Sequence, residues 1–591
     1  MSRENKFGSN LPNFLLVAVS QAKLAICKGY KFGSKLPNSL SVAVSQAKLA
    51  ICKGYKFGGK LPNSLSVAVP QAALAVCGGI KMRYILKAYE MKLYDRDTSE
   101  RIGIPSMVLM ERAALAVVES LREQGRMPQR VLVAAGMGNN GGDGLAAGRL
   151  LAKEGASVTF YMAGNSDKMT EETKRQFSIL KNLGFSIQSK LESSEYDMVV
   201  DALFGIGLSR NVEGEYLSLI REINALGKKG AFVVSLDIPS GVCADTGRIL
   251  GEAVKAHLTV TFGYAKRGHF LYPGREYTGK LKVKDIGITD KSFEKGRPGA
   301  FGYEKEDLPG LLPMRSPWGN KGTFGKALLV AGSYDMCGAS ILCGKSILRA
   351  GAGMVKIITP ACNRIILQEA FPEAMLYTFE EAPDREKVKD ALDWADVVVA
   401  GPGLGTDNTA KELMGYLLED KRHPMVIDAD GLNLIAAHQG FFHLAKEREE
   451  RGLVITPHPG ELMRLLKTDK EDYERNREQL IFELANRLHC VVAAKDAATL
   501  VAENDRDEVY LNTSGNDGMA TAGSGDVLAG IIGGLLAQGM DCFSGTCLGA
   551  YLHGLAGEKA SAKKGHYGMT ASDLVEELSF VTAFEQGKEK F

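Results

Sequence analysis

A small-residue turn that ends in a carboxylate is the feature of this sequence best suited to catalysis. Residues 521–526 read Thr-Ala-Gly-Ser-Gly-Asp, and an apolar run from Val527 to Leu536 follows at once. A helix that begins at such a turn presents free backbone N–H groups, which bind phosphate, and Asp526 beside them can accept the proton of an attacking hydroxyl group. The segment predicts an enzyme that handles phosphoryl groups.

Three apolar segments in the first half of the chain also run into polar residues. Residues 131–135 precede a glycine-rich run at 136–144, residues 198–201 end in an aspartate, and so do residues 232–237. If these segments are parallel strands, their carboxyl ends share one sheet edge, and the polar residues there converge on one crevice. They are Asn139, Asn140, Asp143, Asp201, Asp237 and Ser240. Each aspartate alone could instead be a helix N-cap or an Asx-turn residue.

Holding both sets of residues requires two hydrophobic cores. The chain has 591 residues, whereas single cores stop growing at about 250–300 residues. Turn formers concentrate at 296–299 and 308–313, which indicates a boundary there. Strand-like and helix-like segments alternate on both sides of it. We therefore predict an α/β protein with a Rossmann-like three-layer αβα domain at 82–295 and a second α/β domain at 296–591.

Composition limits the class of partner. The 72 Lys and Arg residues nearly balance the 70 Asp and Glu residues, so charge gives no case for nucleic acid or an anionic membrane. The ten cysteines lack Cys-x-x-Cys spacing, which favours reduced thiols over zinc ligands. No run approaches the ~20 apolar residues of a membrane helix. We expect a cytoplasmic protein that acts on small molecules and forms a homo-oligomer.

The first 81 residues form a separate problem. Residues 6–30, 31–55 and 56–80 are near-identical copies with a 25-residue period. Folded repeats diverge and need distinct capping units, so we interpret 1–81 as a non-functional extension, such as a translated tandem repeat or a misassigned start. An interaction or targeting arm is the alternative.

The first globular region resembles the epimerase domain of NAD(P)H-hydrate repair proteins. The resemblance rests on the motifs at 139–144, 201–207 and 237–241 and on the helical segment 104–114. It implies that Asp201 is the acid/base at the epimerised carbon and that Asn140, Asp201 and Ser240 hold a potassium ion. It implies substrate contacts from Asn139, Asn140, Gly141, Gly142, Asp143, Gly205, Ile206, Gly207, Leu208, Ser209, Arg210, Asn211 and Asp237.

The second region resembles the ADP- or ATP-dependent NAD(P)H-hydrate dehydratase, which has a ribokinase-like fold. Seven motifs between residue 321 and Asp526 carry this resemblance. It implies a catalytic Asp526 and a magnesium ion on the nucleotide phosphates. It implies that Ala339, Gly405, His458 and Asp526 bind the hydrated dinucleotide, and that Lys495, Asp496, Ala497, Ala498, Thr499 and Gly525 bind ADP or ATP. Two residues depart from the family pattern, Asn320 in place of His and Asp496 in place of Gly.

Three further residues allow either a site role or a structural one. Asp428 and Asp430 follow a predicted strand and could be site residues or turn caps, while His553 lies on an apolar helical pattern that favours a core histidine. Together the resemblances imply a bifunctional metabolite-repair enzyme, an isomerase joined to a lyase. The alternatives are a ribokinase-like small-molecule kinase with a non-catalytic N-terminal binding domain, and a non-enzymatic scaffold. An ordinary dehydrogenase fits poorly, because the Gly-x-Gly-x-x-Gly spacing is missing.

Overall fold

The structure is a computed structural model that describes residues 83–188, 195–448 and 452–582. The predicted repeat extension at 1–81 lies outside the described residues. Within the described ranges, no helix combines the length and apolarity that crossing a membrane requires.

The N-terminal domain is built on a parallel sheet with the strand order β4-β3-β2-β5-β6-β7-β9. Its strands are β2 (Arg130–Ala135), β3 (Ser157–Met162), β4 (Ile187–Gln188), β5 (Met198–Ala202), β6 (Phe232–Leu236), β7 (Leu258–Phe262) and β9 (Lys280–Lys284). Its helices are α4 (Ala88–Asp97), α5 (Ser106–Glu123), α6 (Asn139–Lys153), α7 (Glu171–Asn182), α8 (Gly214–Lys228) and α9 (Gly274–Thr278).

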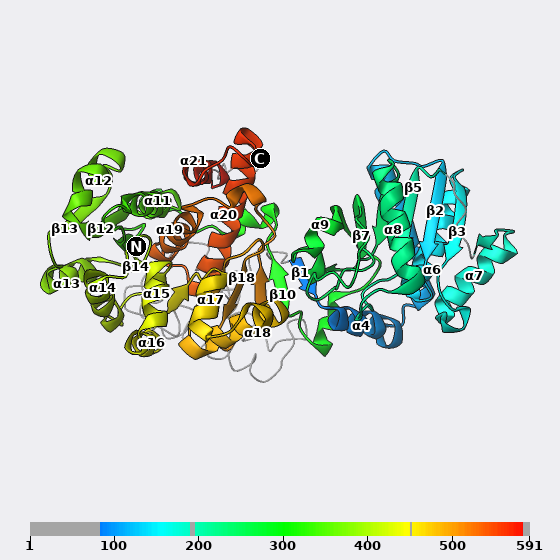
Figure 1. Cartoon of the computed structure of the whole chain (residues 1–591), viewed down its shortest axis with the longest axis horizontal. Helices are drawn as coiled ribbons and strands as arrows, with labels where there is room; N and C mark the ends of the chain where they lie inside the picture. Colours follow the sequence, from blue (N-terminus) through cyan, green and yellow to red (C-terminus); the bar gives the residue numbers. More distant parts are fainter. Residues whose placement is uncertain (1–82, 189–194, 449–451, 583–591) are drawn as a thin grey trace, which may run out of the picture. The chain divides into compact units, whose positions relative to one another are not determined.

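Both faces of this sheet are buried, as the apolar strand runs require. On β2, Val131 and Val133 pack into a core with α5, α6 and α7, whereas Leu132 and Ala134 face the opposite core, which α8 covers. Figure 1 shows α6 and α8 beside the strands β2 and β5. The result is the three-layer αβα arrangement predicted from the sequence.

A second, longer mixed sheet has the strand order β13-β12-β11-β14-β15-β16-β17-β18-β19-β10-β1-β8. Its strands from the C-terminal domain are β10 (Ala300–Gly302), β11 (Lys326–Val330), β12 (Met354–Pro360), β13 (Met375–Phe379), β14 (Val397–Ala400), β15 (Met425–Ile427), β16 (Leu453–Ile455), β17 (Val491–Ala494), β18 (Leu500–Glu503) and β19 (Val509–Leu511). Two short strands from the N-terminal part of the chain, β1 (Arg83–Leu86) and β8 (Ala265–Lys266), extend this sheet beyond β10. The strands from β13 to β17 are parallel, and β18 is antiparallel to both of its neighbours.

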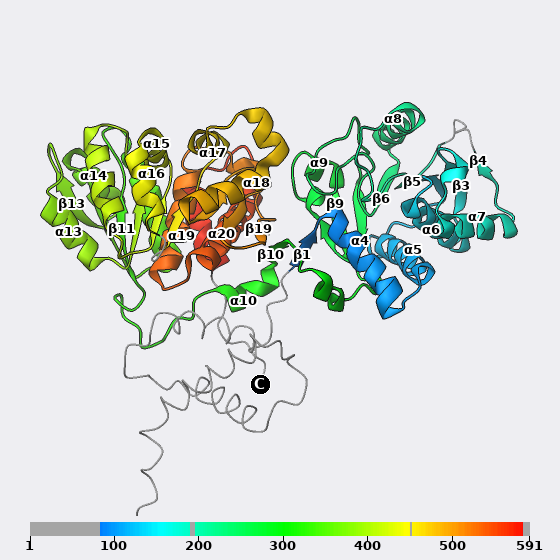
Figure 2. The same ribbon diagram turned by 90° about the horizontal axis from the view of Figure 1, so that it is seen from below.

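Helices again cover both faces of this sheet (Figures 1 and 2). They are α10 (Leu308–Leu311), α11 (Cys337–Arg349), α12 (Arg364–Ala370), α13 (Arg385–Trp394), α14 (Asn408–Glu419), α15 (Asp430–Ala437), α16 (Gln439–Lys446), α17 (Pro459–Leu466), α18 (Lys470–Leu488), α19 (Ser524–Ala537), α20 (Cys542–Lys564) and α21 (Ala571–Val581). The predicted fold class, two α/β domains, is confirmed.

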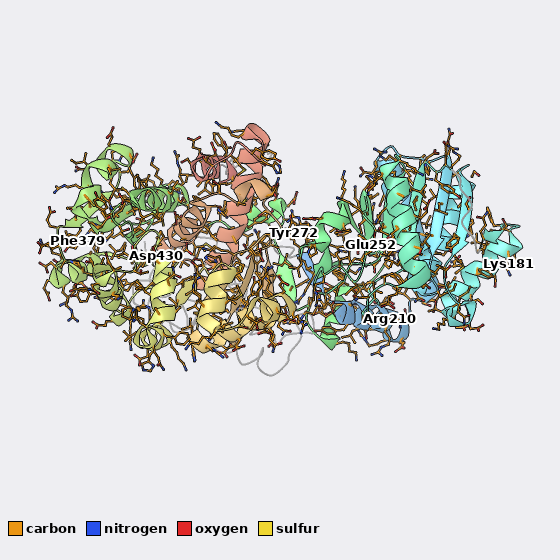
Figure 3. The ribbon with its side chains drawn as sticks, viewed as in Figure 1. Lys181, Arg210, Glu252, Tyr272, Phe379 and Asp430 are labelled. Atoms are coloured by element: carbon orange, nitrogen blue, oxygen red, sulfur yellow. The ribbon has the colours of Figure 1, made fainter. Side chains whose placement is uncertain are left out.

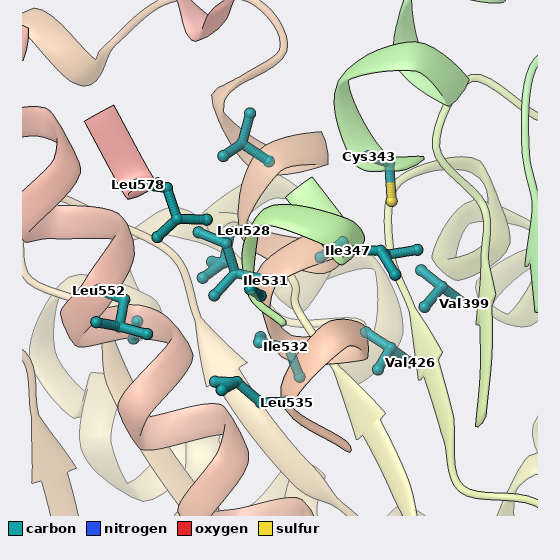
Figure 4. Packing of buried hydrophobic residues seen from close by; sticks show 14 of the residues in the cluster. Cys343, Ile347, Val399, Val426, Leu528, Ile531, Ile532, Leu535, Leu552 and Leu578 are labelled. Atoms are coloured by element: carbon teal, nitrogen blue, oxygen red, sulfur yellow. The ribbon is translucent and has the colours of Figure 1, made fainter. Parts of the chain in front are cut away.

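Helix α19 lies at the centre of the C-terminal core. Its apolar residues, among them Leu528, Ile531 and Leu535, pack between α11, α20, α21 and the sheet, as Figure 4 shows. This burial explains why residues 527–537 are apolar on every side of the helix. It also fixes the N-terminus of α19, and with it Asp526, relative to the sheet edge.

Two elements of the N-terminal domain place its polar residues. Helix α6 begins at Asn139, so most of the glycine-rich run 136–144 forms its first turns. A Cβ atom at Gly141 would lie 1.9 Å from the carbonyl oxygen of Gly136, so only glycine permits this close approach. Strand β5 runs to Ala202, which places Asp201 inside the strand, beside Ser235 of β6.

Candidate active sites

The N-terminal domain has a cavity of about 570 Å³ at the carboxyl ends of its strands. It lies where the strand order reverses, between β2 and β5, the usual position of ligands in open α/β sheets. Its walls include the start of α6, the loop 203–210 after β5, and residues of α4 and α5. Arg210, labelled in Figure 3, belongs to this loop.

A buried ion pair joins two sides of this cavity. The Lys266 ammonium pairs with the carboxylate of Asp237, and it also donates to Thr261 Oγ1 at 2.8 Å and to the Phe262 carbonyl at 3.1 Å. These contacts use all three N–H donors of the ammonium. Burial favours the neutral form of Asp237, but the charge of Lys266 outweighs it and lowers the pKa of Asp237.

The backbone around Asp237 is held in a strained conformation. Asp237 has φ +63°, in the left-handed region that a non-glycine residue adopts rarely. His269 supports it: Nδ1 accepts from the Lys266 backbone N–H, so the other ring nitrogen carries the proton and donates to the Asp237 carbonyl at 2.9 Å. Burial lowers the pKa of His269 to about 3, which keeps the ring neutral.

Asp143 contributes a second carboxyl group to the same cavity. It lies in α6, and its side chain makes no hydrogen bond to any residue in the described part of the chain. Burial raises its pKa well above the ordinary value, and the carboxylates of Asp237 and Asp95 add to this effect. These surroundings favour the protonated form of the carboxyl group.

Asp201, the predicted acid/base, has different surroundings. Its side chain is buried, and it accepts hydrogen bonds from Ser240 Oγ (2.6 Å), Ser235 Oγ (2.7 Å) and the Ser240 N–H (2.9 Å). It does not line the cavity. Burial raises its pKa, while the hydrogen bonds from Ser240 and Ser235 oppose this. The acid/base role stays a prediction, but the geometry disfavours it because these contacts already occupy both carboxylate oxygens.

The structure brings most of the predicted N-terminal residues together. Those in the cavity wall are Asn139, Asn140, Asp143, Gly205, Ile206, Gly207, Leu208, Ser209, Arg210 and Asp237. Gly141, Gly142, Asp201, Asn211 and Ser240 lie outside the wall. Sequence reasoning missed Lys266. Its signal was available, a lysine four residues after an apolar strand, but such a residue is far more often exposed.

The C-terminal domain has a cavity of about 900 Å³ at the equivalent place on its sheet. The strand order reverses between β11 and β14, and the cavity wall includes the start of α11, the turn after β14 and the start of α19. Asp430, labelled in Figure 3, lies in this wall at the start of α15. Its carboxylate accepts the Gly405 N–H at 2.9 Å, so it fixes the turn after β14.

A second buried Lys–Asp pair lies in this cavity. The Lys495 ammonium is 2.5 Å from Asp428 Oδ1, which also accepts the Thr456 hydroxyl at 2.7 Å. Asp428 is only 1% exposed, and its side chain caps no turn within the described residues. Of the two roles that the sequence left open, site residue and turn cap, the first therefore fits. Within the described residues, the Lys495 ammonium makes no other hydrogen bond, which leaves two donors for a ligand.

Asp526 stands at the N-terminus of α19, after a turn in which Gly523 has φ +87°. Burial raises the pKa of Asp526 to about 7, and the nearby carboxylate of Asp428 adds to the effect. A Cβ atom at Gly525 would lie 3.2 Å from the Lys495 ammonium. The glycine thus lets a cation approach the free N–H groups of the helix, which creates a site for a phosphate.

In the loop 495–499, which the resemblance predicts to bind the nucleotide, contacts within the protein compensate the charge of Asp496. Asp496 forms an ion pair with Arg477 at 3.2 Å and accepts the Ala497 N–H at 2.8 Å. The negative charge introduced at this position is therefore compensated within the protein. Asn320, the other departure, only closes its own turn by accepting the N–H groups of Gly322 and Thr323.

Two histidines complete this site. His458 is the N-cap of α17 and accepts the N–H groups of Gly460 and Glu461 through Nδ1, while its ring lines the cavity. His553 was expected in the core, but it lines the cavity and its Nε2 lies 3.2 Å from Ser524 Oγ. Burial lowers the pKa of His553 to about 4, so the ring is neutral.

Most predicted C-terminal residues also meet in one cavity. Its wall contains Ala339, His458, Lys495, Asp496, Ala497, Thr499, Gly525 and Asp526. Gly405 and Ala498 lie outside the wall, where Gly405 contacts Asp430 and the Ala498 carbonyl accepts from Arg477.

The fold and the two cavities are those of a two-domain α/β enzyme with one site on each sheet. Comparison with known proteins gives the family. A family model described as NAD(P)H-hydrate dehydratase matches residues 327–579, and one described as YjeF-related protein N-terminus matches residues 106–268.

Relatives match across both domains. The chain is 37% identical to a bifunctional NAD(P)H-hydrate repair enzyme of Thermofilum pendens over 84% of its length and 95% of that protein. It is 35% identical to the Escherichia coli enzyme of the same description, over 83% of this chain and 92% of that protein. The chain therefore belongs to the bifunctional NAD(P)H-hydrate repair enzymes.

Proposed function

We propose that the N-terminal site interconverts the R and S epimers of hydrated NADH or NADPH, and that the C-terminal site dehydrates the S epimer with ADP or ATP. The observation that carries this division is the pair of separate cavities. Each lies at the switch point of its own sheet, and each combines a buried Lys–Asp pair with a carboxyl group of raised pKa.

Dehydration needs activation because hydroxide is a poor leaving group. Phosphorylation turns the hydroxyl into a good leaving group, which the ring nitrogen then expels. In this site Asp526 takes the hydroxyl proton, and a pKa of about 7 suits that task near neutral pH. The free N–H groups of α19 and the two unused donors of Lys495 stabilise the charge on the transferring phosphoryl group.

The acidic residues of this site also fit a magnesium ion on the nucleotide. Asp428 and Asp526 offer carboxylate oxygens in the cavity wall, and Asp428 Oδ2 points towards the start of α19. Magnesium is held by one or two carboxylates together with substrate phosphates. When bound, the ion would neutralise charge on the phosphates. A solved Bacillus subtilis ADP/ATP-dependent NAD(P)H-hydrate dehydratase was co-crystallised with ATP/Mg2+ (28% identical over 47% of this chain and 96% of that one, TM-score 0.40).

A potassium ion fits the N-terminal site at Asn140, Asp201 and Ser240. Both polar atoms of the Asn140 side chain are buried without a hydrogen-bond partner in the described part of the chain, which leaves an amide oxygen to be satisfied. Oxygen ligands suit a hard cation. When bound, the ion would add positive charge beside the loop 205–211.

We further propose the limits of the two domains, a cytoplasmic location and a homo-oligomeric state. The domain limits at 82–295 and 296–591 enclose both matched regions. Every cysteine in the described residues is free, which supports a reducing compartment such as the cytoplasm. We also keep the proposal of a homo-oligomer, which sedimentation analysis of the purified chain tests.

The test of the function is recovery of NADH from a mixture of hydrated epimers, followed by its near-ultraviolet absorbance. With magnesium, potassium and ADP or ATP, we expect full recovery. Recovery that stops at the S fraction would remove the epimerase activity from the proposal. A stable phosphorylated product without NADH would favour a small-molecule kinase, and no reaction with either nucleotide would favour a scaffold.

A further inference from the structure

The N-terminal cavity also holds an acid and a base, the two groups that an epimerisation needs. We infer that Asp143 is the proton donor and Asp237 the proton acceptor of the epimerase reaction, with Lys266 as the residue that positions Asp237. The inference rests on the epimerase activity proposed above for this domain. It replaces Asp201 in the acid/base role.

The chemistry requires two groups. In a hydrated nicotinamide ring, the hydroxyl group is on a carbon bonded to the ring nitrogen. Inversion proceeds when a base takes the hydroxyl proton and the O–H electron pair becomes the second bond of an aldehyde. The C–N bond breaks, and its electron pair goes to the ring nitrogen, which takes a proton from an acid. Rotation of the aldehyde and reversal of these steps close the ring on the other face and restore both groups.

Asp237 fits the base. Its carboxylate lines the cavity and stays ionised beside Lys266, and its strained backbone is held by His269. Lys266 itself is a poor candidate for the proton donor. Its side chain is 1% exposed, and all three of its N–H groups are already used, by Asp237, Thr261 and the Phe262 carbonyl. It therefore acts through Asp237.

Asp143 fits the acid. It is in the cavity wall, and its carboxyl group is free of hydrogen bonds to the described residues, so its proton is available to a ligand. Several charged groups from other elements also line this cavity. They are Lys92 and Asp95 of α4, Glu172 of α7, Arg210, Asp237 and Lys266. The carboxylates of Asp95 and Asp237 favour the protonated form of Asp143, and Lys266 opposes them.

Asp201 is poorly placed to act as an acid or base on a substrate in the cavity. Three hydrogen bonds shorter than 3 Å hold its two carboxylate oxygens inside the sheet. Reaching a substrate in the cavity would require breaking the contacts to Ser235 and Ser240. The position suits a fixed charge that orders the loop after β5, or a ligand of a cation.

The experiment uses the full chain with the purified R epimer of hydrated NADH and follows its conversion to the S epimer by chromatography, without nucleotide. We expect Asp143→Asn to lower kcat by about 10²-fold or more. Dehydration of the S epimer by the same molecules, with ADP or ATP and magnesium, reports folding and should be unchanged. Lys266→Met should shift the pH profile of epimerisation, and Lys266→Arg should restore part of the rate lost in Lys266→Met. A merely structural role of Lys266 would produce neither result.

The outcomes separate the inference from the proposed function. If the unmodified chain does not epimerise the R form, the proposed function fails. If it does, but Asp143→Asn epimerises within about threefold of it, the inference is overturned. It is also overturned if Asp201→Asn, with S dehydration intact, removes the alkaline limb of the pH profile and Asp143→Asn does not.

Discussion

The two candidate active sites contain the same pair of groups in different arrangements. Each has a buried Lys–Asp pair and a second carboxyl group of raised pKa, at the switch point of a parallel sheet. Lys266 has all three donors occupied, whereas Lys495 keeps two donors and lies against the N-terminus of α19. This difference fits the proposed reactions. Phosphoryl transfer at the C-terminal site needs a cation with free N–H donors that can bind a phosphate, whereas proton transfer at the N-terminal site does not.

The largest expected effect comes from removing the carboxyl group of Asp526 in the C-terminal domain. In Asp526→Asn, we expect dehydration of the S epimer to fall by about 10²- to 10⁴-fold, because the amide cannot take the hydroxyl proton. Epimerisation should be unchanged, and it serves as the internal control. A loss of both activities would mean that the two sites do not work separately.

The pH profiles should separate the two carboxyl groups. Asp526 acts as a base and must lose its proton, so kcat/KM of dehydration should rise about tenfold per pH unit until pH reaches about 7 and then level off. In the proposed mechanism Asp143 is the acid and must keep its proton, so epimerisation should fall as the pH rises past its raised pKa. Initial rates of each half-reaction between pH 5 and 9 test this; profiles of the same shape would contradict the comparison.

Breaking either buried pair should destabilise the protein. In Lys495→Met and Lys266→Met, one buried carboxylate loses its partner, and we expect the free energy of unfolding of the affected domain to fall by about 3–5 kcal/mol. Arg385→Gln is the matched control. It removes an ion pair whose side chains are 66% and 53% exposed, and the expected change is about 0–1 kcal/mol. Equal denaturant midpoints for all three variants would show that the buried ion pairs contribute no more to stability than the exposed one.

The smallest effect is expected at the loop 495–499, which is predicted to bind the nucleotide. Arg477→Gln leaves the Asp496 carboxylate uncompensated in this loop, so the KM for ADP or ATP should rise several-fold through like-charge repulsion. In the Arg477→Gln and Asp496→Gly double variant, we expect KM to return towards its original value. A KM that does not change in the single variant would mean that Asp496 lies too far from the phosphates to matter.

Much of this account could be predicted from the sequence. Apolar runs ending in polar residues predicted the strands β2, β5 and β6 and their shared edge, since backbone periodicity is a local property. The predicted loop and helix residues largely meet in two cavities, because parallel strands impose that convergence. The family assignment is confirmed by relatives that match both domains.

The rest depended on contacts between residues distant in sequence. The sequence could not indicate that Lys266 reaches Asp237, 29 residues earlier, or that Ser235 and Ser240 enclose Asp201. His553 had the pattern of a core residue, and only the packing of α20 beside α19 brings it to Ser524. The glycines of the run 136–144 are of a type that usually indicates a loop, whereas here most of them lie in helix α6 and permit its close packing on the sheet.

The most direct test of the divided chemistry is a complementation measurement. Asp143→Asn and Asp526→Asn chains are each given the purified R epimer with magnesium, potassium and ADP or ATP, and NADH is followed by absorbance, first separately and then after mixing. We predict almost no NADH from either variant alone and recovery in the mixture, because the S epimer formed by one chain diffuses to the other. Rapid NADH formation by Asp143→Asn alone, or none in the mixture, would contradict the account.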